Sequence, residues 1–317
     1  MIVFGTLTTG ELISLITYAM QILMSLMMIS MVMVMFTISR ASADRILEVF
    51  NEKIDLKNPE HPVTEVKDGS VTFEHVYFSY DEKAENYVLK DINFTVAPGE
   101  TVGIIGSTGS AKSSLVQLIP RLYDVTKGRI LVGGIDVRNY DLRALRDAVG
   151  MVLQKNVLFS GTIKENLRWG DKTAMDDEIV QVSRFAQAAE FIERFPDRYD
   201  TYLEEGGTNV SGGQKQRLTI ARALLKKPKI LILDDSTSAV DTKTDAKIRQ
   251  ALREQLPQTT KFIIAQRINS VMDADKIIVL DRGQISGIGT HEKLLKTNDI
   301  YREVYESQTK GGIHLDG

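Results

Sequence analysis

An uncharged stretch near the start of the chain constrains the fold more than any other feature. From Leu12 to Ile38 no side chain is charged, and methionine is concentrated there. A helix needs about 20 apolar residues to cross a bilayer, so this stretch is long enough to span one. Arg40 and Arg45 follow it, as basic residues do on the cytoplasmic side of membrane helices. We therefore predict a transmembrane helix at 12–38 within a segment 1–50, with the residues after 40 in the cytoplasm.

Two other interpretations of this stretch stay open. A secretory signal has an apolar region of about 7–15 residues behind a basic start. Here the opening is uncharged apart from Glu11, and the basic residues come afterwards, which argues against a signal. A buried helix of a soluble domain is the second alternative. Polar residues such as Thr17, Gln21, Ser25 and Ser30 would face other membrane helices, where they either line a substrate path or only hydrogen-bond between helices.

The remaining residues read as a linker and one large domain. The helix is expected to continue through Arg40–Asn51, and Asn58–Pro62 breaks it with two prolines. We predict a linker at 51–68, a domain at 69–306 and a poorly ordered polar tail at 307–317. The formal net charge is −3, so no global field points to nucleic acid. The chain has no cysteine, which excludes disulfides and thiolate metal sites.

The pattern of apolar residues in the domain predicts an α/β fold. Val71–Phe78 alternates as a half-buried strand does. A second strand at Glu100–Ile105 leads into a glycine-bearing loop, and Lys112–Leu122 follows as a helix. Lys229–Leu233 and Phe262–Ala265 are short apolar runs, as buried parallel strands are. We therefore expect a parallel core with antiparallel additions.

The glycine-bearing loop fits a phosphate-binding pattern. Residues 106–113 match the G-x-x-x-x-G-K-[ST] frame at its first glycine, its lysine and its serine. Lys112 would contact the β- and γ-phosphates of ATP, and Ser113 would ligate Mg²⁺. Alanine stands at the pattern's last glycine, and if φ is positive there Ala111 costs about 1–2 kcal/mol. The alternative is that alanine fits after a small backbone adjustment. The expected ATP-binding residues of this loop are Gly106, Ser107, Thr108, Gly109, Ser110, Ala111, Lys112, Ser113 and Ser114.

Two further motifs follow along the chain. Ile230–Asp235 is an apolar strand that ends in two carboxylates, and Asp234 is placed to hold Mg²⁺ directly or through water. Val210–Arg217 carries a Ser-Gly-Gly stretch that opens a helix, which is an anion-binding arrangement. Taken alone, such a stretch is more often a simple turn and helix cap.

Together and in this order, these motifs resemble the ATP-binding cassette (ABC) superfamily over residues 65–305. The Ser-Gly-Gly-Gln signature makes the resemblance specific. It implies a P-loop NTPase (RecA-like) core with an antiparallel β subdomain and a helical signature subdomain, preceded by one transmembrane helix. A membrane helix ahead of the cassette is the exporter arrangement. Because residues 12–38 are similar to the last membrane helix of an exporter, Met1 is expected to mark a truncated gene or a fragment of a longer protein.

The resemblance also implies roles for individual residues. Tyr80 sits where an aromatic side chain stacks on adenine, and Gln154 matches a glutamine that links the Mg²⁺ site to the membrane domains. Asp241 ends a loop that crosses the interface between two cassettes. Each ATP in this family lies between the phosphate loop of one cassette and the signature of the other. The signature residues expected to contact the partner's ATP are Ser211, Gly212, Gly213 and Gln214.

Two positions depart from the family pattern where catalysis takes place. Asp235 replaces the glutamate that orients and deprotonates the attacking water, and it is shorter by one methylene. Gln266 replaces the histidine that contacts the γ-phosphate, and glutamine cannot carry charge or relay a proton. Misplacing a catalytic group by about 1 Å can reduce a rate on the order of 10²-fold. We therefore expect slow hydrolysis at this chain's own site beside an intact signature.

These features predict the ATPase subunit of an exporter in the cell membrane, with its cassette in the cytoplasm. A second half-transporter with consensus catalytic residues would complete a heterodimer that moves a small molecule or a lipid. One alternative is a non-hydrolysing regulatory subunit that only lends its signature. Another is a soluble cassette protein in repair or translation, against which the uncharged stretch argues. No nucleic-acid partner is expected.

Overall fold

The structure is a computed structural model that describes residues 5, 7–52, 54–81, 86–236 and 238–311. The chain divides into two compact units, residues 1–55 and 56–317. The first unit contains the helix α1 (Thr9–Asn51), and the second contains the α/β domain.

Helix α1 is long and apolar enough to cross a membrane. Its most apolar window has a mean hydropathy of 2.3, and none of its residues is buried within the unit. Thr8 and Glu11 form a reciprocal cap at its start. The hydroxyls of Thr17, Ser25 and Ser30 donate to backbone carbonyls four residues earlier, at 2.9, 2.9 and 3.0 Å. These hydroxyls are therefore satisfied within the helix itself and need no partner from another helix.

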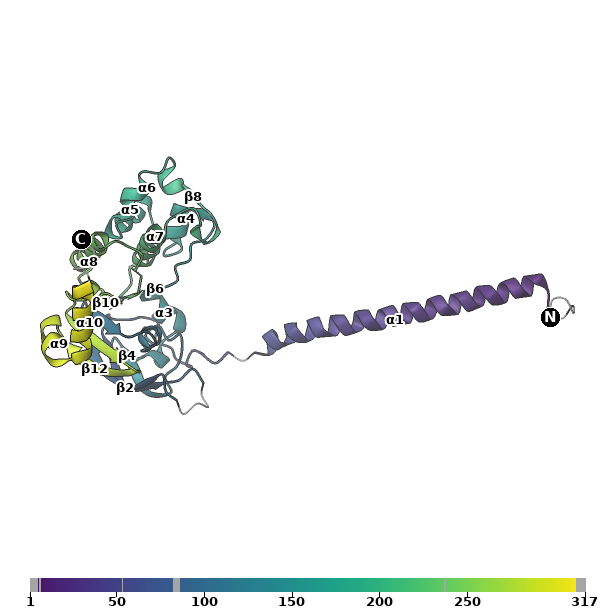
Figure 1. The fold of residues 1–317 in the computed structure, drawn as a ribbon, viewed down its shortest axis with the longest axis horizontal. Coiled ribbons are helices and arrows are strands. Elements are labelled where there is room, and N and C mark those ends of the chain that lie inside the picture. Colours follow the sequence, from purple (N-terminus) through teal and green to yellow (C-terminus); the bar gives the residue numbers. More distant parts are fainter. Residues whose placement is uncertain (1–4, 6, 53, 82–85, 237, 312–317) are drawn as a thin grey trace. The chain divides into compact units, whose positions relative to one another are not determined.

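A six-stranded sheet forms the centre of the second unit (Figure 1), in the order β12-β11-β3-β10-β9-β6. The five strands from β11 to β6 are parallel, and β12 adds antiparallel at one edge. This confirms the predicted parallel core with antiparallel additions. The bounds in that order are Gln284–Gly289, Lys276–Asp281, Thr101–Gly106, Thr260–Ile264, Ile230–Asp234 and Val149–Val152.

Two smaller sheets accompany the central one. An antiparallel four-stranded sheet has the order β2-β1-β4-β5, and β7 pairs with β8 in a short ribbon. The predicted strand at Val71–Phe78 is β1. The bounds of the others are Leu89–Val96 (β2), Lys127–Val132 (β4), Ile135–Asp136 (β5), Gly161–Thr162 (β7) and Tyr202–Leu203 (β8).

The central sheet is buried on both faces because alternate residues of its strands belong to two different cores. Ile105 and Leu231 belong to the core shared with the helix α7 (Gly212–Leu225), whereas Ile104 and Ile230 belong to the core shared with the four-stranded sheet. All four side chains are at most 2% exposed. This explains why the strands read as continuous apolar runs instead of alternating ones.

Helices α4 to α7 form a lobe at one end of the domain, away from β2 and β12 (Figure 1). The helices of the domain are α2 (Lys112–Gln117), α3 (Leu142–Asp147), α4 (Ile163–Arg168), α5 (Asp176–Phe185), α6 (Ala189–Ile192), α7 (Gly212–Leu225), α8 (Thr242–Gln255), α9 (His291–Thr297) and α10 (Asp299–Gly311). Helix α2 is shorter than the predicted Lys112–Leu122. It ends at Gln117 because Pro120 has no N–H to donate and disfavours helical backbone at Ile119.

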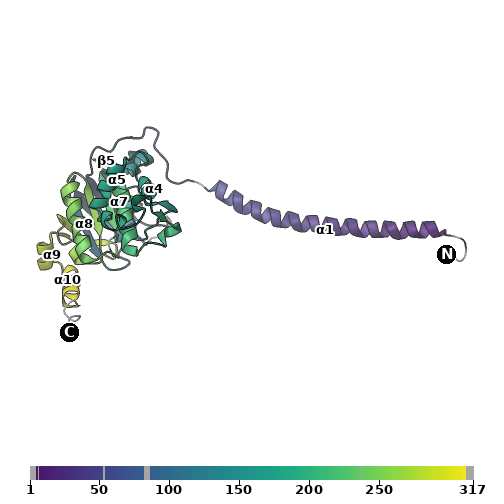
Figure 2. The ribbon, with the colours of Figure 1, turned by 90° about the horizontal axis from the view of Figure 1, so that it is seen from above.

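Helices α9 and α10 lie side by side, with α10 leading toward the C-terminus (Figure 2). The prediction of a poorly ordered tail from Ser307 was wrong for 307–311, which continue α10, and residues 312–317 lie outside the described ones. The physical reason is that α10 is anchored. Tyr301 is fully buried, and Val304 and Tyr305 pack against the same core.

Candidate active site

The loop that joins β3 to α2 brings the predicted phosphate-binding residues together. Gly106 ends β3 in contact with β11, where a Cβ would lie 2.2 Å from the Leu280 carbonyl oxygen, so only glycine fits. Gly109 has φ 81°, a left-handed conformation that glycine adopts without strain. Ser110 is buried, and its N–H donates to the Ser107 carbonyl at 3.2 Å. The loop is therefore a tight, defined turn at the carboxyl end of a central strand.

Ala111 occupies a conformation that suits glycine. It caps α2 with φ 71° and ψ 25°, in the left-handed region. A residue with a Cβ is strained there by about 1–2 kcal/mol. The predicted cost of Ala111 depends on a positive φ, and φ is positive in this structure.

Lys112 folds back onto its own loop. Its Nζ donates to the carbonyls of Gly106 and Ser107, each at 2.8 Å. Burial lowers the pKa of Lys112, while the negative charges of Asp234 and Asp235 act in the opposite direction. The ammonium group therefore lies between the loop and the two carboxylates, where a phosphate group could take over its hydrogen bonds.

The two carboxylates at the end of β9 have different surroundings. Asp234 is 4% exposed, and burial raises its pKa despite a hydrogen bond from Ser113 and the nearby Lys112 charge. Asp235 has φ 48°, and burial, followed by the charge of Asp234, raises its pKa as well. Its N–H donates to the Ile264 carbonyl at 3.0 Å, which fixes the backbone against β10. Two adjacent acids with raised pKa values form a site that favours a cation.

Gln266 lies directly beside Asp235. Its Nε2 donates to Asp235 Oδ2 at 2.8 Å, and this bond lowers the carboxyl pKa, though not enough to offset burial. The next residue, Arg267, donates from Nη2 to the Ser238 carbonyl at 3.4 Å. The two residues that the sequence places at the expected catalytic positions, Asp235 and Gln266, are therefore in contact.

Tyr80 is hydrogen-bonded to α2, the helix that follows the phosphate loop. Its hydroxyl lies 2.8 Å from Ser114 Oγ, and its ring packs edge-on against Phe78 and Tyr123 at 4.7 and 5.1 Å. The ring is 55% exposed. The Tyr80 ring therefore lies next to the start of α2 with more than half of its side chain exposed, and this exposed part is available to a nucleotide base.

The signature segment opens α7. Ser211 and Gln214 form a reciprocal cap, in which Gln214 N–H donates to Ser211 Oγ at 3.3 Å and Ser211 N–H donates to Gln214 Oε1 at 2.8 Å. The glycines between them pack against the next loop, where a Cβ on Gly213 would lie 2.9 Å from the Ala239 carbonyl oxygen. The signature is therefore held against the loop that ends at Asp241, which caps α8 by accepting from Thr244 N–H at 2.9 Å.

Gln216 joins the signature helix to that loop. Its Nε2 donates to Ser238 Oγ at 3.2 Å, and its Oε1 accepts from Ala239 N–H at 3.0 Å. Gln216 is only 5% exposed, so both bonds are shielded from water. On the same helix, Thr219 donates to Asn156 Oδ1 at 2.7 Å, which ties α7 to the loop after β6.

The predicted residues thus fall into two groups. The phosphate loop, Asp234, Asp235 and Gln266 meet at the carboxyl ends of β3, β9 and β10, where ligands bind in open α/β sheets. Within the part of the chain that is described, no hydrogen bond or ion pair joins residues 106–114 to the signature at 211–214. Gln154 is exposed after β6, and among the described residues its side chain makes no hydrogen bond to Asp234 or Ser113.

Comparison with known proteins identifies the domain. Residues 89–238 match the protein family described as ABC transporter. The chain carries an ABC transporter ATP-binding domain. Domains of this family are ATPases, and we refer to residues 56–317 of this chain as the cassette.

The matches extend beyond the cassette. The chain is 43% identical over 304 residues to an uncharacterised ABC transporter ATP-binding protein of Bacillus subtilis, covering 96% of this chain and 52% of the relative. It is 40% identical to a putative multidrug export ATP-binding/permease protein of the same organism, covering 97% and 53%. The solved structure of a bacterial Atm1-family ABC exporter with ATP bound is similar, with a TM-score of 0.81, 36% identity and coverage of 95% and 53%. The chain therefore spans about half the length of the relatives it matches.

The donors available at the site suit Mg²⁺ bound together with ATP. Among the described residues, no three His, Cys, Asp or Glu side chains gather closely enough to hold a metal alone. The buried Asp234 carboxylate and the Ser113 hydroxyl beside it supply the oxygen ligands that Mg²⁺ prefers. Phosphate oxygens and water would have to supply the rest, as is usual for nucleotide-bound Mg²⁺.

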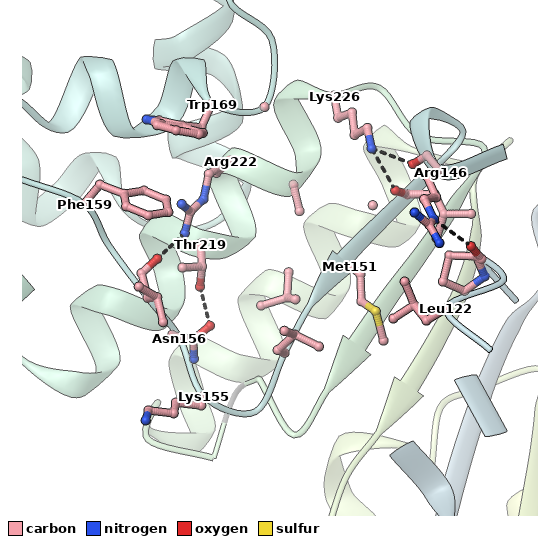
Figure 3. Close-up of a pocket in the computed structure, with 18 residues that line it drawn as sticks. Leu122, Arg146, Met151, Lys155, Asn156, Phe159, Trp169, Thr219, Arg222 and Lys226 are labelled. Carbon is pink, nitrogen blue, oxygen red and sulfur yellow. Dashed lines mark hydrogen bonds between the residues drawn. The ribbon is translucent and has the colours of Figure 1, made fainter. Parts of the chain in front are cut away.

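A groove of about 430 Å³ opens on the cassette (Figure 3), lined mainly by β6, α7 and the loop residues that include Phe159 and Trp169. Arg222, Phe159 and Trp169 form a stack on its wall, with the Phe159 and Trp169 rings 4.6 Å apart and the guanidinium 5.9 Å from Phe159. Arg222 also donates to the Val157 carbonyl at 2.7 Å. Trp169 is 61% exposed, which is unusual for a tryptophan and indicates a contact surface.

Sequence reasoning missed three residues that matter for the geometry. Gln216 could have been found, because it is a polar residue at a buried position of a helix next to the signature. Trp169 is the chain's single tryptophan, but nothing in the sequence places it opposite Phe159. Gln308 contacts Gln266 and Ile268 from a segment that was predicted to be disordered, and no local pattern signals this.

Proposed function

We propose that this chain is the ATP-binding subunit of a membrane exporter, and that its own phosphate site holds Mg-ATP but hydrolyses it slowly. The contact between Gln266 and Asp235 carries the proposal. In a hydrolytic site of this family the carboxylate must hold a water molecule in line with the γ-phosphate. Here one of its oxygens accepts a bond from an amide that can neither carry charge nor relay a proton.

The same two residues suit the binding of ATP. Gln266 can donate a hydrogen bond to a phosphate oxygen, and Lys112 can exchange its two carbonyl contacts for phosphate. Asp234 and Ser113 provide oxygen ligands for Mg²⁺. The loss is therefore confined to the hydrolytic step, where losing one transition-state donor typically costs roughly 10²–10³ in rate.

The signature supports a partner of a specific kind. The Ser211 and Gln214 cap is complete, and Gln216 holds the neighbouring loop, so this side of the cassette is well formed. We infer that the signature completes the ATP site of a second half-transporter that has consensus catalytic residues. The assembly would then contain one weak site and one efficient site in a heterodimer.

The groove beside Trp169 is the surface we assign to the membrane part of the transporter. Its floor is apolar, and its charged lining residues are all basic, namely Arg146, Lys155, Arg222 and Lys226. The exposed Gln154 lies beside this lining, between Leu153 and Lys155. Relatives described as putative multidrug export proteins favour a small-molecule or lipid substrate, and α1 favours a location in the cell membrane with the cassette in the cytoplasm.

The strain at Ala111 favours a second candidate, a regulatory subunit that does not hydrolyse ATP and acts only through its signature. If the strain at Ala111 prevents the phosphate loop from binding ATP, this chain's own ATP site stays empty during the transport cycle. Affinity falls about tenfold for each 1.4 kcal/mol, so strain of about 1–2 kcal/mol decides between weak and adequate binding.

Steady-state phosphate release by the chain tests the first candidate. The chain is compared with the double variant Asp235→Glu/Gln266→His, which restores both residues of the family pattern. We expect the double variant to hydrolyse Mg-ATP on the order of 10² times faster. A variant with Lys112→Ala in addition controls for contaminating ATPases. An unchanged rate in the double variant would exclude these two positions as the cause of slow hydrolysis.

A further inference from the structure

Gln308, near the end of α10, hydrogen-bonds the backbone on both sides of Arg267. Its Oε1 accepts from the Ile268 N–H at 2.9 Å, and its Nε2 donates to the Gln266 carbonyl at 2.7 Å. One amide therefore satisfies a donor and an acceptor of the same short segment, as a neighbouring strand would. The partners lie 40 and 42 residues earlier in the sequence, so the contact is made by the tertiary fold.

The helix that carries Gln308 is fixed in place. Tyr301, in the first turn of α10, is fully buried, and its hydroxyl lies 2.8 Å from His291 Nδ1. Burial raises the pKa of Tyr301 to about 12, so its hydroxyl remains protonated at neutral pH. The Tyr301 N–H also donates to Asn298 Oδ1 at 2.8 Å. Gln308 follows this anchor by about two helical turns, so its amide is presented from a rigid support.

The segment that Gln308 holds is the one that aims Gln266 at the active site. The Gln266 backbone carbonyl accepts from Gln308, while its side chain donates to Asp235. Arg267, between the two bonded backbone groups, reaches the Ser238 carbonyl beside the signature helix. A shift of this segment would therefore move both the Asp235 contact and the contact near the signature.

We propose that Gln308 is a positioning residue of the ATP site, which fixes residues 266–268 so that Gln266 stays on Asp235 and Mg-ATP is retained. Gln308 acts through Gln266, so it is not itself a catalytic residue. The effect on Mg-ATP rests on the proposed function, whereas the effect on the backbone of 266–268 does not. The Gln308 side chain thereby connects the C-terminal helix α10 to the active site.

The test measures backbone hydrogen exchange and Mg-ATP release in the full chain. In Gln308→Leu the Ile268 N–H loses its acceptor, and we expect its exchange to accelerate about tenfold, a change equal to the net free energy of roughly one hydrogen bond. We expect Mg-ATP to dissociate faster by a similar factor. Gln308→Glu keeps the acceptor for Ile268 but loses the donor to Gln266, so it should protect the Ile268 N–H while still releasing Mg-ATP faster.

Gln250→Leu is the matched control. Gln250 is also an exposed glutamine on a helix, and among the described residues its amide donates within α8, to Glu254 at 2.8 Å. This variant should leave both measurements unchanged. Unchanged exchange in Gln308→Leu would overturn the contact, and faster exchange with unchanged Mg-ATP release would overturn the positioning role. Failure of the proposed function looks different, because the wild-type chain itself would then retain no Mg-ATP while the exchange difference persisted.

Discussion

Gln266 Nε2 donates to Asp235 Oδ2 at 2.8 Å, so the two residues that we expect at catalytic positions contact each other directly. The contact joins the carboxyl ends of β9 and β10, which are neighbouring parallel strands. Because each residue sets the environment of the other, their effects on hydrolysis should not be independent.

We expect the two reversions to be non-additive. In Asp235→Glu alone the longer carboxylate still faces an uncharged amide, and in Gln266→His alone the histidine faces a carboxylate that is too short. Each single variant should therefore gain less than tenfold in the rate of phosphate release, while the double variant gains on the order of 10²-fold. A double-mutant cycle of kcat measures the coupling, and additive single effects would show that the pair does not act as a unit.

Replacing Ala111 by glycine should stabilise the chain and tighten Mg-ATP binding. The change removes about 1–2 kcal/mol of backbone strain at φ 71° in the folded state. Glycine also gives the unfolded chain more conformational freedom, which lowers the stability by about 0.4–1 kcal/mol. The net gain in unfolding free energy is therefore expected to be about 1 kcal/mol, measured by denaturant titration of the nucleotide-free chain. Ala144→Gly, in the helix α3, is the control and should lose stability, because glycine in a helix interior is unfavourable.

We expect the ionised Asp234 carboxylate to lower the folding stability of the nucleotide-free chain while it provides a ligand for Mg²⁺. Burial raises its pKa in the folded state, so the folded chain binds that proton more tightly than the unfolded chain does. Its contribution to stability is therefore most favourable at low pH and is lost as pH rises through the folded-state pKa, which leaves a full penalty at pH 7. Asp234→Asn should raise the melting temperature of the nucleotide-free chain at pH 7, and this gain should shrink as pH falls toward 3.8, the ordinary pKa of the carboxyl.

The expected gain for Asp234→Asn is on the order of 1 kcal/mol, or roughly 2–4 °C for a chain of this size. The same variant should lose the Mg²⁺ dependence of ATP binding. Asp197→Asn, an exposed carboxylate in the helical lobe, serves as the control and should change neither measurement. A melting temperature for Asp234→Asn that is lower than that of the wild type at pH 7 would contradict the penalty.

The stack on the groove wall can be followed through its own tryptophan. Phe159→Ala removes the ring that contacts both Arg222 and Trp169, and we expect a loss of about 2 kcal/mol from aromatic and cation–π contacts. Phe159→Leu keeps apolar area and should lose about half as much. Since Trp169 is the chain's single tryptophan, its emission should shift to longer wavelength in both variants. Unchanged emission would show that the rings do not stack in solution.

The sequence predicted the parts of the site that depend on local order along the chain. The phosphate loop after β3 and the acids after β9 were expected at the ends of apolar strands, and the structure places them there. The end of α2 at Gln117 was missed, because Pro120 acts on residues before it. The contact of Gln266 with Asp235 was not predicted, because it depends on the pairing of β9 with β10, which no local pattern encodes.

Analysis of the bound nucleotide tests the central claim most directly. The chain is loaded with Mg-ATP, free nucleotide is removed, and the bound nucleotide is identified over time beside Asp235→Glu/Gln266→His and Ala111→Gly. We expect the wild-type chain to retain ATP as ATP, long after the double reversion has converted it to ADP. Conversion by the wild type as fast as by the double reversion would contradict slow hydrolysis. Nucleotide retained only by Ala111→Gly would contradict ATP binding at this site and favour a subunit that acts through its signature alone.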